Sequence, residues 1–300
     1  MTPKTAGGAK LVAAGILLSR IFGLVRQRVT AHYLGTGPVA DALAAAFRIP
    51  NLLQNLFGEG VLSASFIPVY AKLVADGKRE EAGRVAGAVL SLLALVTAVV
   101  VLLGVLAAPW LVALIAGGFD ESTRALTTQL VRIIFPGVGV LVLSAWCLGV
   151  LNSHRRFFLS YVSPVLWNIA IIAAMLIAGP RQDAEHLVVT VAWASVLGSL
   201  LQFGIQVPTV WRVDRDIRFS MAGAPAALST GIRSGVRTVV GNFGTVLVGR
   251  GVIQFSGFVD TLIASLIGAG ALATLNYSQA ISMLPVSLFG MSVSAAELPA

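Results

Sequence analysis

The residues with the clearest chemistry in this chain are three arginines inside its first apolar stretch. Arg20, Arg26 and Arg28 lie between positions 19 and 34, where the sequence reads SRIFGLVRQRVTAHYL. An ionisable side chain at bilayer depth costs roughly 2.5–3.5 kcal/mol on insertion scales. A span with three of them must turn its inner face to water, an anion or protein. Because guanidinium groups bind phosphates bidentately, the pattern predicts a polar pathway for a negatively charged cargo.

The spacing of these arginines decides what they can share. On a straight helix Arg20 and Arg26 point about 120° apart, because six residues advance about 600°. Gly23 lies between them and makes a local bend inexpensive, so a bent helix would aim both guanidinium groups at one diphosphate. Arg48 and Arg250 fall inside later apolar stretches. Each is either a further ligand of the anion or a side chain that snorkels to the lipid headgroups.

The second apolar stretch follows a turn at Thr36–Gly37 and contains an aspartate. Antiparallel pairing about this turn would bring position 26 opposite 47–48, and position 28 within about one helical turn of Asp41. A buried carboxylate is costly unless it is paired, so Arg28 is its predicted partner and His32 the second choice. Alternatively, Asp41 caps the second helix after the glycine–proline turn.

Helix-breaking and polar residues interrupt the same stretch further on. Pro50 removes a backbone hydrogen bond, and the amide of Asn51 can satisfy the groups that are freed. Glu59 is either a gating or coupling carboxylate or a partner of interfacial cations such as Lys72. The predicted hinge and gate positions are therefore Gly23, Pro50, Glu59 and Gly60.

Composition indicates a membrane protein. The chain is 57% hydrophobic and 11% charged, with a mean hydropathy of +0.88, whereas a soluble protein carries about 25% charged residues. Runs of about 20 apolar residues mark membrane-spanning helices. We expect eight, at roughly 11–34, 39–71, 85–108, 125–151, 161–179, 187–211, 235–266 and 271–297. The second carries Pro50 and Pro68 and is expected to be bent or broken.

The distribution of cations predicts the orientation. Thirteen of the 21 lysines and arginines flank alternate ends of these spans, beginning with Lys4 and Lys10, and the opposite loops hold only Arg124 and Arg181. Arg132 lies just inside the fourth span. By the positive-inside rule the cation-rich side and the N-terminus are cytoplasmic. The first apolar run is short and leads to no cleavage site, so we interpret it as a retained span rather than a signal peptide.

Several chemistries are not supported. The single cysteine, Cys147, and three histidines without ligand spacing predict no metal site, and we expect no cofactor beyond a coupling cation of unknown identity. No nucleophile–base constellation is present, so we expect no enzyme, and nothing indicates a nucleic-acid partner.

A weak internal repeat predicts two similar lobes. Gly35-x-Gly37-x-x-Ala40 recurs as Gly268-x-Gly270-x-x-Ala273, and Phe57-Gly58 recurs as Phe289-Gly290. Because six spans separate the copies and both have the same orientation, the repeat is parallel. We expect an all-α protein with an N-terminal six-helix lobe at 1–215, a cytoplasmic linker at 216–234 and an incomplete second lobe at 235–300. The abrupt end at Ala300 suggests a truncated chain.

Several motifs resemble one known family. They are Ser19-Arg20-Ile-Phe-Gly23-x-x-Arg26, Ala40-Asp41-Ala42, Phe47-Arg-Ile-Pro50-Asn51-Leu52-Leu53, Phe57-Gly-Glu59-Gly60-x-x-Ser63-x-x-Phe66-x-Pro68, Leu151-Asn152, Ser163-Pro164 with Asn168, and Leu284-Pro285 with Leu288-Phe289-Gly290. Together they resemble the MurJ (MviN) lipid II flippases of the multidrug/oligosaccharidyl-lipid/polysaccharide exporter superfamily. The resemblance covers essentially the whole chain.

The resemblance implies fourteen helices around a V-shaped cavity. It further implies an undecaprenyl-diphosphate-linked saccharide-peptide as cargo, moved from the inner to the outer leaflet of the bacterial cytoplasmic membrane by alternating access. Membrane lipids and proteins of cell-wall synthesis or division are the implied partners. Arg20 and Arg26 match arginines thought to hold the diphosphate, and Asp41 matches a functional aspartate.

Two positions depart from the family pattern. Gln54 and Ala280 stand where the family often has arginine, and Arg250 is a candidate substitute. The predicted binding set is Arg20, Arg26, Arg28, Asp41, Arg48, Asn51, Gln54 and Arg250. The alternatives are an ion-coupled exporter of another substrate in the same superfamily, or an inactive truncated scaffold. Exporters of cationic drugs should line the cavity with acids, whereas arginines dominate here.

Overall fold

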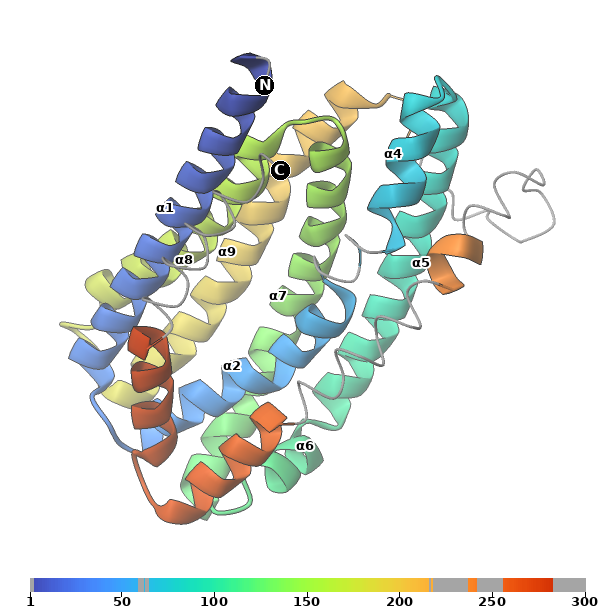
Figure 1. Ribbon diagram of the computed structural model, residues 1–300. Coiled ribbons are helices and arrows are strands. Elements are labelled where there is room, and N and C mark those ends of the chain that lie inside the picture. The colour runs from blue at the N-terminus through green and yellow to red at the C-terminus, as the bar shows by residue number, and fades with distance from the viewer. Residues whose placement is uncertain are drawn as a thin grey trace.

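The computed structural model describes residues 3–58, 62, 65–215, 217, 237–241 and 256–282. In this part of the chain every regular element is a helix (Figure 1). They include α1 (Pro3–Leu34), α2 (Pro38–Phe57), α4 (Ile67–Ala75), α5 (Arg79–Leu106), α6 (Ala108–Ile115), α7 (Glu121–Ser153), α8 (Phe157–Ala178) and α9 (Ala184–Val213). Two further helices, Ser256–Ile267 and 271–282, follow. The prediction of an all-α fold is confirmed.

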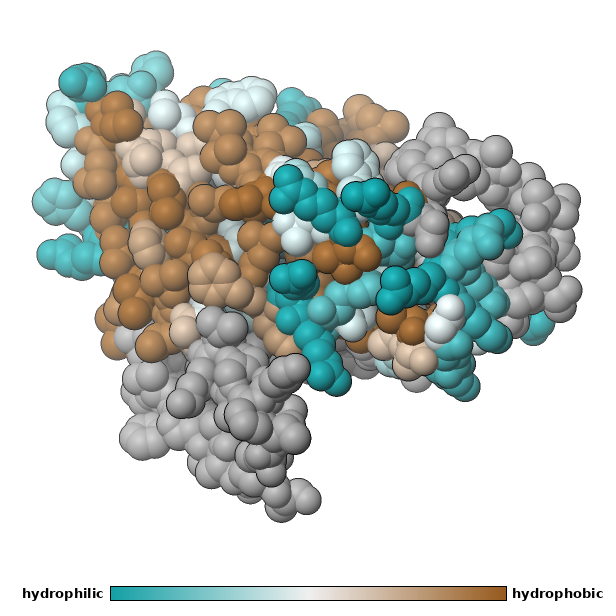
Figure 2. All heavy atoms as spheres, turned by 90° about the horizontal axis from the view of Figure 1, so that it is seen from above, coloured by the Kyte–Doolittle hydropathy of each residue, from teal (hydrophilic) through white to brown (hydrophobic). Residues whose placement is uncertain are grey.

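Four of the described helices, α5, α7, α8 and α9, are long and apolar enough to cross a membrane. Large apolar side chains on their outer surfaces are exposed, as expected for surfaces that face lipid. The helices run up and down, so the N-terminus and the turns at 76–78, 154–156 and 214–215 share one end of the bundle (Figure 1). Figure 2 looks onto this end, where hydrophilic patches lie beside broad hydrophobic surface. The described cation-rich flanks thus lie together, as the sequence predicted.

Helix α7 is the centre of the bundle. It is mostly buried and packs against α2, α5 and α9, while α8 packs between α9 and α1. Helix α1 therefore lies along α8, and α2 lies along α7, instead of along each other. The antiparallel pairing predicted for the first two spans is wrong. Because both helices are anchored to different partners, a gap between them is available for a cavity.

The second predicted span is broken, as expected, but not at its first proline. Pro50 is buried within α2 without ending it. The helix ends at Phe57, and α4 begins at Ile67 with Pro68 in its first turn, where proline costs nothing because that N–H has no helical partner. Glu59 and Gly60, the predicted gate and hinge, lie outside the described residues. So does the predicted linker, apart from Ile217.

Aspartates start two of the long helices at the opposite end of the bundle. Asp120 accepts a hydrogen bond from the Thr123 backbone N–H at 3.3 Å, and Asp183 accepts one from His186 N–H at 2.9 Å. Hydrogen bonds from Ser122 and Thr123 lower the pKa of Asp120 to about 2. Such caps satisfy the first free N–H groups of a helix, and they fix where α7 and α9 begin.

A buried polar cluster joins three helix ends at the cation-rich end of the bundle. Tyr70 on α4 is 0% exposed and donates a hydrogen bond to Asp214 at 2.7 Å. Its hydroxyl also lies 2.9 Å from Nε2 of His154 at the end of α7. Burial lowers the pKa of His154, against the opposing effect of Asp214. The cluster holds α4 against the ends of α7 and α9.

Candidate functional site

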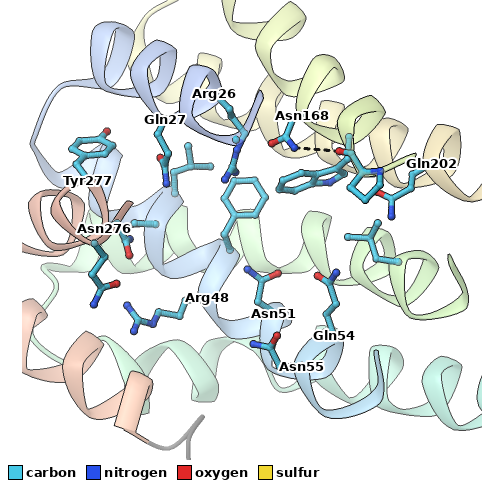
Figure 3. A pocket seen from close by; sticks show the side chains of 18 of the residues that line it. Arg26, Gln27, Arg48, Asn51, Gln54, Asn55, Asn168, Gln202, Asn276 and Tyr277 are labelled. Carbon is cyan, nitrogen blue, oxygen red and sulfur yellow. Dashed lines mark hydrogen bonds between the residues drawn. The ribbon is translucent and has the colours of Figure 1, made fainter. Parts of the chain in front are cut away.

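The main polar cavity lies between α1 and α2, the two helices that do not pack together. Its volume is about 650 Å³. Two cations and many side-chain amides line it: Arg26, Gln27, Arg48, Asn51, Gln54, Asn55, Asn168, Gln202, Asn276 and Gln279. Figure 3 labels all of these side chains except Gln279, and shows the labelled ones projecting from α1, α2, α8, α9 and the helix 271–282 around one space. None of the described residues that line this cavity is a carboxylate, so the formal charge of this described lining is positive.

Arg26 is the cation on the α1 side. Its guanidinium lies 4.9 Å from the centre of the Trp167 ring, and the ring of Trp167 in turn meets Phe47 edge-on at 5.8 Å. The Arg26 Nε is buried and has no hydrogen-bond partner among the described residues. A buried donor without an acceptor costs about 1–3 kcal/mol, more when charged. The site would therefore be stabilised by an anion that accepts a hydrogen bond from Arg26.

Arg48 is the cation on the α2 side. It lies 3.9 Å from Asp260 on the helix Ser256–Ile267, which begins the predicted second lobe. Its side chain is 21% exposed and that of Asp260 is 47% exposed. Asn51, Gln54 and Asn55 follow on the same helix and face the cavity (Figure 3). This side of the cavity thus offers one partly neutralised cation and three amides.

A hydrogen-bond network fixes the wall behind the cavity. Ser144 on α7 donates a hydrogen bond to Gln206 on α9 at 2.8 Å and accepts one from Gln202 at 3.1 Å. Gln206 in turn donates a hydrogen bond to Ser163 on α8 at 2.5 Å. Ser163 donates to the Ser160 carbonyl at 3.3 Å, the carbonyl that Pro164 leaves without a helical donor. Buried networks whose members are satisfied hold helices rigidly. Three helices therefore present a preformed wall.

Asp41 lies beside the turn at residues 35–37, between α1 and α2, rather than in the cavity. This turn is called the outer turn below, after the predicted orientation. It is 1% exposed and accepts hydrogen bonds from the backbone N–H groups of Gly270 at 2.5 Å and Ala273 at 2.7 Å. The predicted Arg28–Asp41 pair is wrong: within the described chain Arg28 makes no ion pair with it, because α1 packs along α8. Asp41 does act as a cap, but of the helix 271–282 and not of α2.

The two copies of the repeat meet at this turn. Gly35 and Gly270 have φ of +58° and +85°, a region that glycine adopts without strain. A Cβ at Gly270 would lie 3.3 Å from the Thr36 carbonyl carbon, so the backbones are close. Tyr277 also donates to the Gly35 carbonyl at 3.1 Å. The first copy thus holds the second copy by backbone and carboxylate contacts.

Comparison with known proteins places the chain. The model of the family described as lipid II flippase MurJ matches residues 30–300. The chain belongs to the MurJ family. It is 33% identical over 294 residues to a protein of Burkholderia cenocepacia named lipid II flippase MurJ, and the match covers 97% of this chain and 56% of that protein.

Other relatives agree. A probable lipid II flippase MurJ of Haemophilus influenzae is 33% identical over 296 residues, covering 94% of this chain and 55% of the relative. The solved structure of a lipid II flippase MurJ in an inward closed conformation has a TM-score of 0.75 at 24% identity, covering 95% of this chain and 57% of that one. A MATE transporter gives 0.64 at 17% identity, covering 95% and 63%. The chain spans about half the length of the curated MurJ relatives that it matches.

The structure separates the site residues predicted for this MurJ family member into three groups. Gly23, Arg26, Arg48, Asn51 and Gln54 line one cavity. Arg20, Arg28 and Asp41 do not line it, Pro50 is buried in α2, and Arg250 lies outside the described residues.

The positions of the three α1 arginines follow from helix geometry. Helix α1 is uninterrupted through Gly23. Arg20 is seven residues from Gln27, so it lies on nearly the same face about 10 Å closer to the cation-rich end. It is exposed and stands beyond the cavity wall. Arg28 points about 160° away from Arg26 around the helix. The bend that would bring Arg20 and Arg26 onto one diphosphate is not needed for Arg26 alone to reach the cavity.

Most of the amides in the cavity were not predicted from the sequence. Gln27, Asn55, Gln202 and Asn276 line the cavity but carry no charge, so a search for ionisable residues passed over them. The available signal was an amide within an apolar run, since polar side chains at membrane depth generally face a cavity or protein. Trp167 was missed because its ring is typical of an ordinary membrane helix.

Proposed function

We propose that this chain forms the cargo-binding lobe of a lipid II flippase, and that its cavity holds the diphosphate and adjoining sugar of an undecaprenyl-linked peptidoglycan precursor. The cavity between α1 and α2 carries the proposal, because the described residues that line it include two arginines and many amides but no carboxylate. Arg26 and Arg48 supply charge for the diphosphate. The amides supply paired donors and acceptors of the kind that sugar hydroxyls require.

The size of the cavity suits the diphosphate and the adjoining sugar and excludes a whole lipid. About 650 Å³ falls within the range of about 300–1,000 Å³ for small-molecule sites. The polyprenyl tail is apolar and needs no such site, so it remains in the hydrocarbon of the membrane. Transport then consists of moving the headgroup through the bilayer while the tail stays in lipid, from the inner to the outer leaflet in the predicted orientation.

The contacts at the outer turn support alternating access. The carboxylate of Asp41 and the backbone of 35–37 hold the start of the helix 271–282. In our proposal these contacts keep the N-terminal lobe and the start of the second lobe in contact at this end. Release of the cargo on this side requires that these contacts break. Arg20, on the same face of α1 toward the cation-rich end, would meet the diphosphate before it reaches Arg26.

The test is a binding measurement with a matched control on the same helix. Undecaprenyl diphosphate is titrated into the purified chain in detergent micelles, with Arg26→Gln and Arg28→Gln as variants. Arg26→Gln should weaken binding by about tenfold or more, since a charge-assisted hydrogen bond contributes about 1.5–3 kcal/mol. Arg28→Gln loses the same charge two residues away and should change binding by less than about twofold. Equal effects of both variants would mean that the cavity is not the binding site.

A further inference from the structure

A second polar groove lies on the outside of the bundle, away from the cargo cavity. Its volume is about 760 Å³, and it is formed by one face of α7 together with Pro109 of α6 and Trp193 of α9. The α7 residues on this face form two rows with four-residue spacing, which aligns side chains on a helix: Glu121, Ala125 and Gln129, and Arg124, Thr128 and Arg132. The groove is at the cation-poor end of the bundle.

Arg132 is the unexplained residue in this groove. It is exposed, and it forms no ion pair or side-chain hydrogen bond within the described residues. Arg124, by contrast, donates through Nη2 to the carbonyl oxygens of Gly117 at 3.1 Å and Phe119 at 3.0 Å, which fixes the loop before α7. Within the described residues, Arg124 thus stabilises a loop, whereas Arg132 makes no such contact.

The level of Arg132 in the membrane follows from helix lengths. Helix α7 has 33 residues, about 50 Å, and the hydrocarbon core is about 30 Å thick. If α7 is centred, about 10 Å projects at each side, and Arg132 lies about 6 Å inside the hydrocarbon boundary because it is about 16 Å along the helix. Trp193, nine residues into the 30-residue α9, lies about 6 Å inside by the same reasoning.

Two exposed tryptophans lie at this end of the bundle. Trp193 is 60% exposed and Trp110 on α6 is 82% exposed. Exposed tryptophan is typical of the headgroup region, where the indole has one apolar and one polar contact. A guanidinium at this depth reaches the level of lipid phosphates. Glu121 is the carboxylate of the groove, but it is eleven residues, about 16 Å, from Arg132 and so does not neutralise it.

We propose that this groove is a binding site for the phosphate of an anionic phospholipid, with Arg132 as the main ligand and Gln129 and Trp193 beside it. In the predicted orientation the lipid belongs to the outer leaflet. The site is separate from the cargo cavity and shares no residue with it. A bound lipid would tie α6, α7 and α9 together at the end where the outer turn opens and closes.

The test compares two arginines at the same end of the bundle. The purified chain in nanodiscs of phosphatidylcholine is titrated with phosphatidylglycerol, and the retained phosphatidylglycerol is counted by native mass spectrometry. Arg132→Gln should weaken retention by about tenfold, the effect of losing one charge-assisted contact. Arg181→Gln is the control, because Arg181 is exposed at the same end but outside the groove. It should change retention by less than about twofold.

Two further arms keep the result decisive. Arg132→Lys retains the charge but not the bidentate fork, and it should fall between wild type and Arg132→Gln. Inorganic phosphate at millimolar concentration should not displace the lipid. Displacement would show that the groove binds free phosphate, and would overturn the assignment to a lipid. Equal losses in Arg132→Gln and Arg181→Gln would overturn it as well, since they would reflect net charge alone.

Discussion

Replacing Asp41 by asparagine should loosen the outer turn without changing its shape. The carboxylate accepts from the backbone N–H groups of Gly270 and Ala273, and it is almost fully buried. Asparagine keeps one acceptor oxygen but directs an NH₂ group at the other N–H, which leaves a buried backbone donor without an acceptor. Hydrogen bonds to charged groups contribute about 1.5–3 kcal/mol, and an orphaned buried donor costs about 1–3 kcal/mol. We therefore expect the contact to weaken by about 2–3 kcal/mol.

Amide hydrogen exchange measures this quantity directly. A loss of about 2–3 kcal/mol corresponds to roughly 30- to 140-fold faster exchange at the amides of Gly270 and Ala273, if they exchange by local opening. Amides in the buried middle of α7 serve as an internal reference for global stability. Asp183→Asn is the control, because it removes the same charge at the same end without touching residues 268–273. Unchanged exchange at Gly270 and Ala273 in Asp41→Asn would refute the inference that the carboxylate holds this turn closed.

Two other predictions concern titration and binding. Burial lowers the pKa of His154 below its ordinary value of 6.5, so its contribution to stability is present above pH 6.5 and is lost as the pH falls through the lowered pKa. The thermal midpoint should drop more steeply between pH 7 and 5 in wild type than in His154→Asn, and parallel curves would contradict this. Asp260→Asn releases Arg48 and should tighten binding of undecaprenyl diphosphate by up to about fivefold, given that a half-exposed ion pair contributes about 0–1 kcal/mol. Asp183→Asn, which removes the same charge elsewhere, is the control. Weaker binding in Asp260→Asn than in this control would show that Asp260 positions Arg48 and does not compete with the diphosphate for it.

The sequence was informative about helices and much less so about which helices touch. The long spans could be predicted because apolar runs and the repeated glycine turns are local signals, although α7 and α9 begin at Glu121 and Ala184, a few residues before the predicted starts at 125 and 187. The partner of Asp41 could not, since it lies 229 and 232 residues away and consists of backbone N–H groups, which no side-chain pattern reveals. Pairing α1 with α2 was the natural choice for neighbours joined by a short turn, but the large buried surface of α7 attracts α2 instead.

In the candidate site, too, locally encoded features could be predicted and long-range contacts could not. Arg26 and Arg48 were predictable because a cation inside an apolar run is costly and needs a reason. Arg28 shows the limit of that rule, because it is exposed and lies six residues before the end of α1, where an arginine can snorkel to the headgroups without lining a cavity. The amides of the wall come from five helices that converge in three dimensions, and a single sequence does not show which helices converge.

The contact at Asp41 restricts the amino-acid sequence of the two copies of the repeat in different ways. The first copy must supply a particular side chain, a carboxylate at position 41. The second copy supplies only main-chain N–H groups, so almost any residue satisfies its part. Proline at 270 or 273 would remove one of these N–H groups. A side chain at 270 would be strained, because φ is +85° and its Cβ would lie 3.3 Å from the carbonyl carbon of Thr36. Variation in this turn across relatives should accordingly be shaped by a few forbidden residues in one lobe and by one obligatory residue in the other.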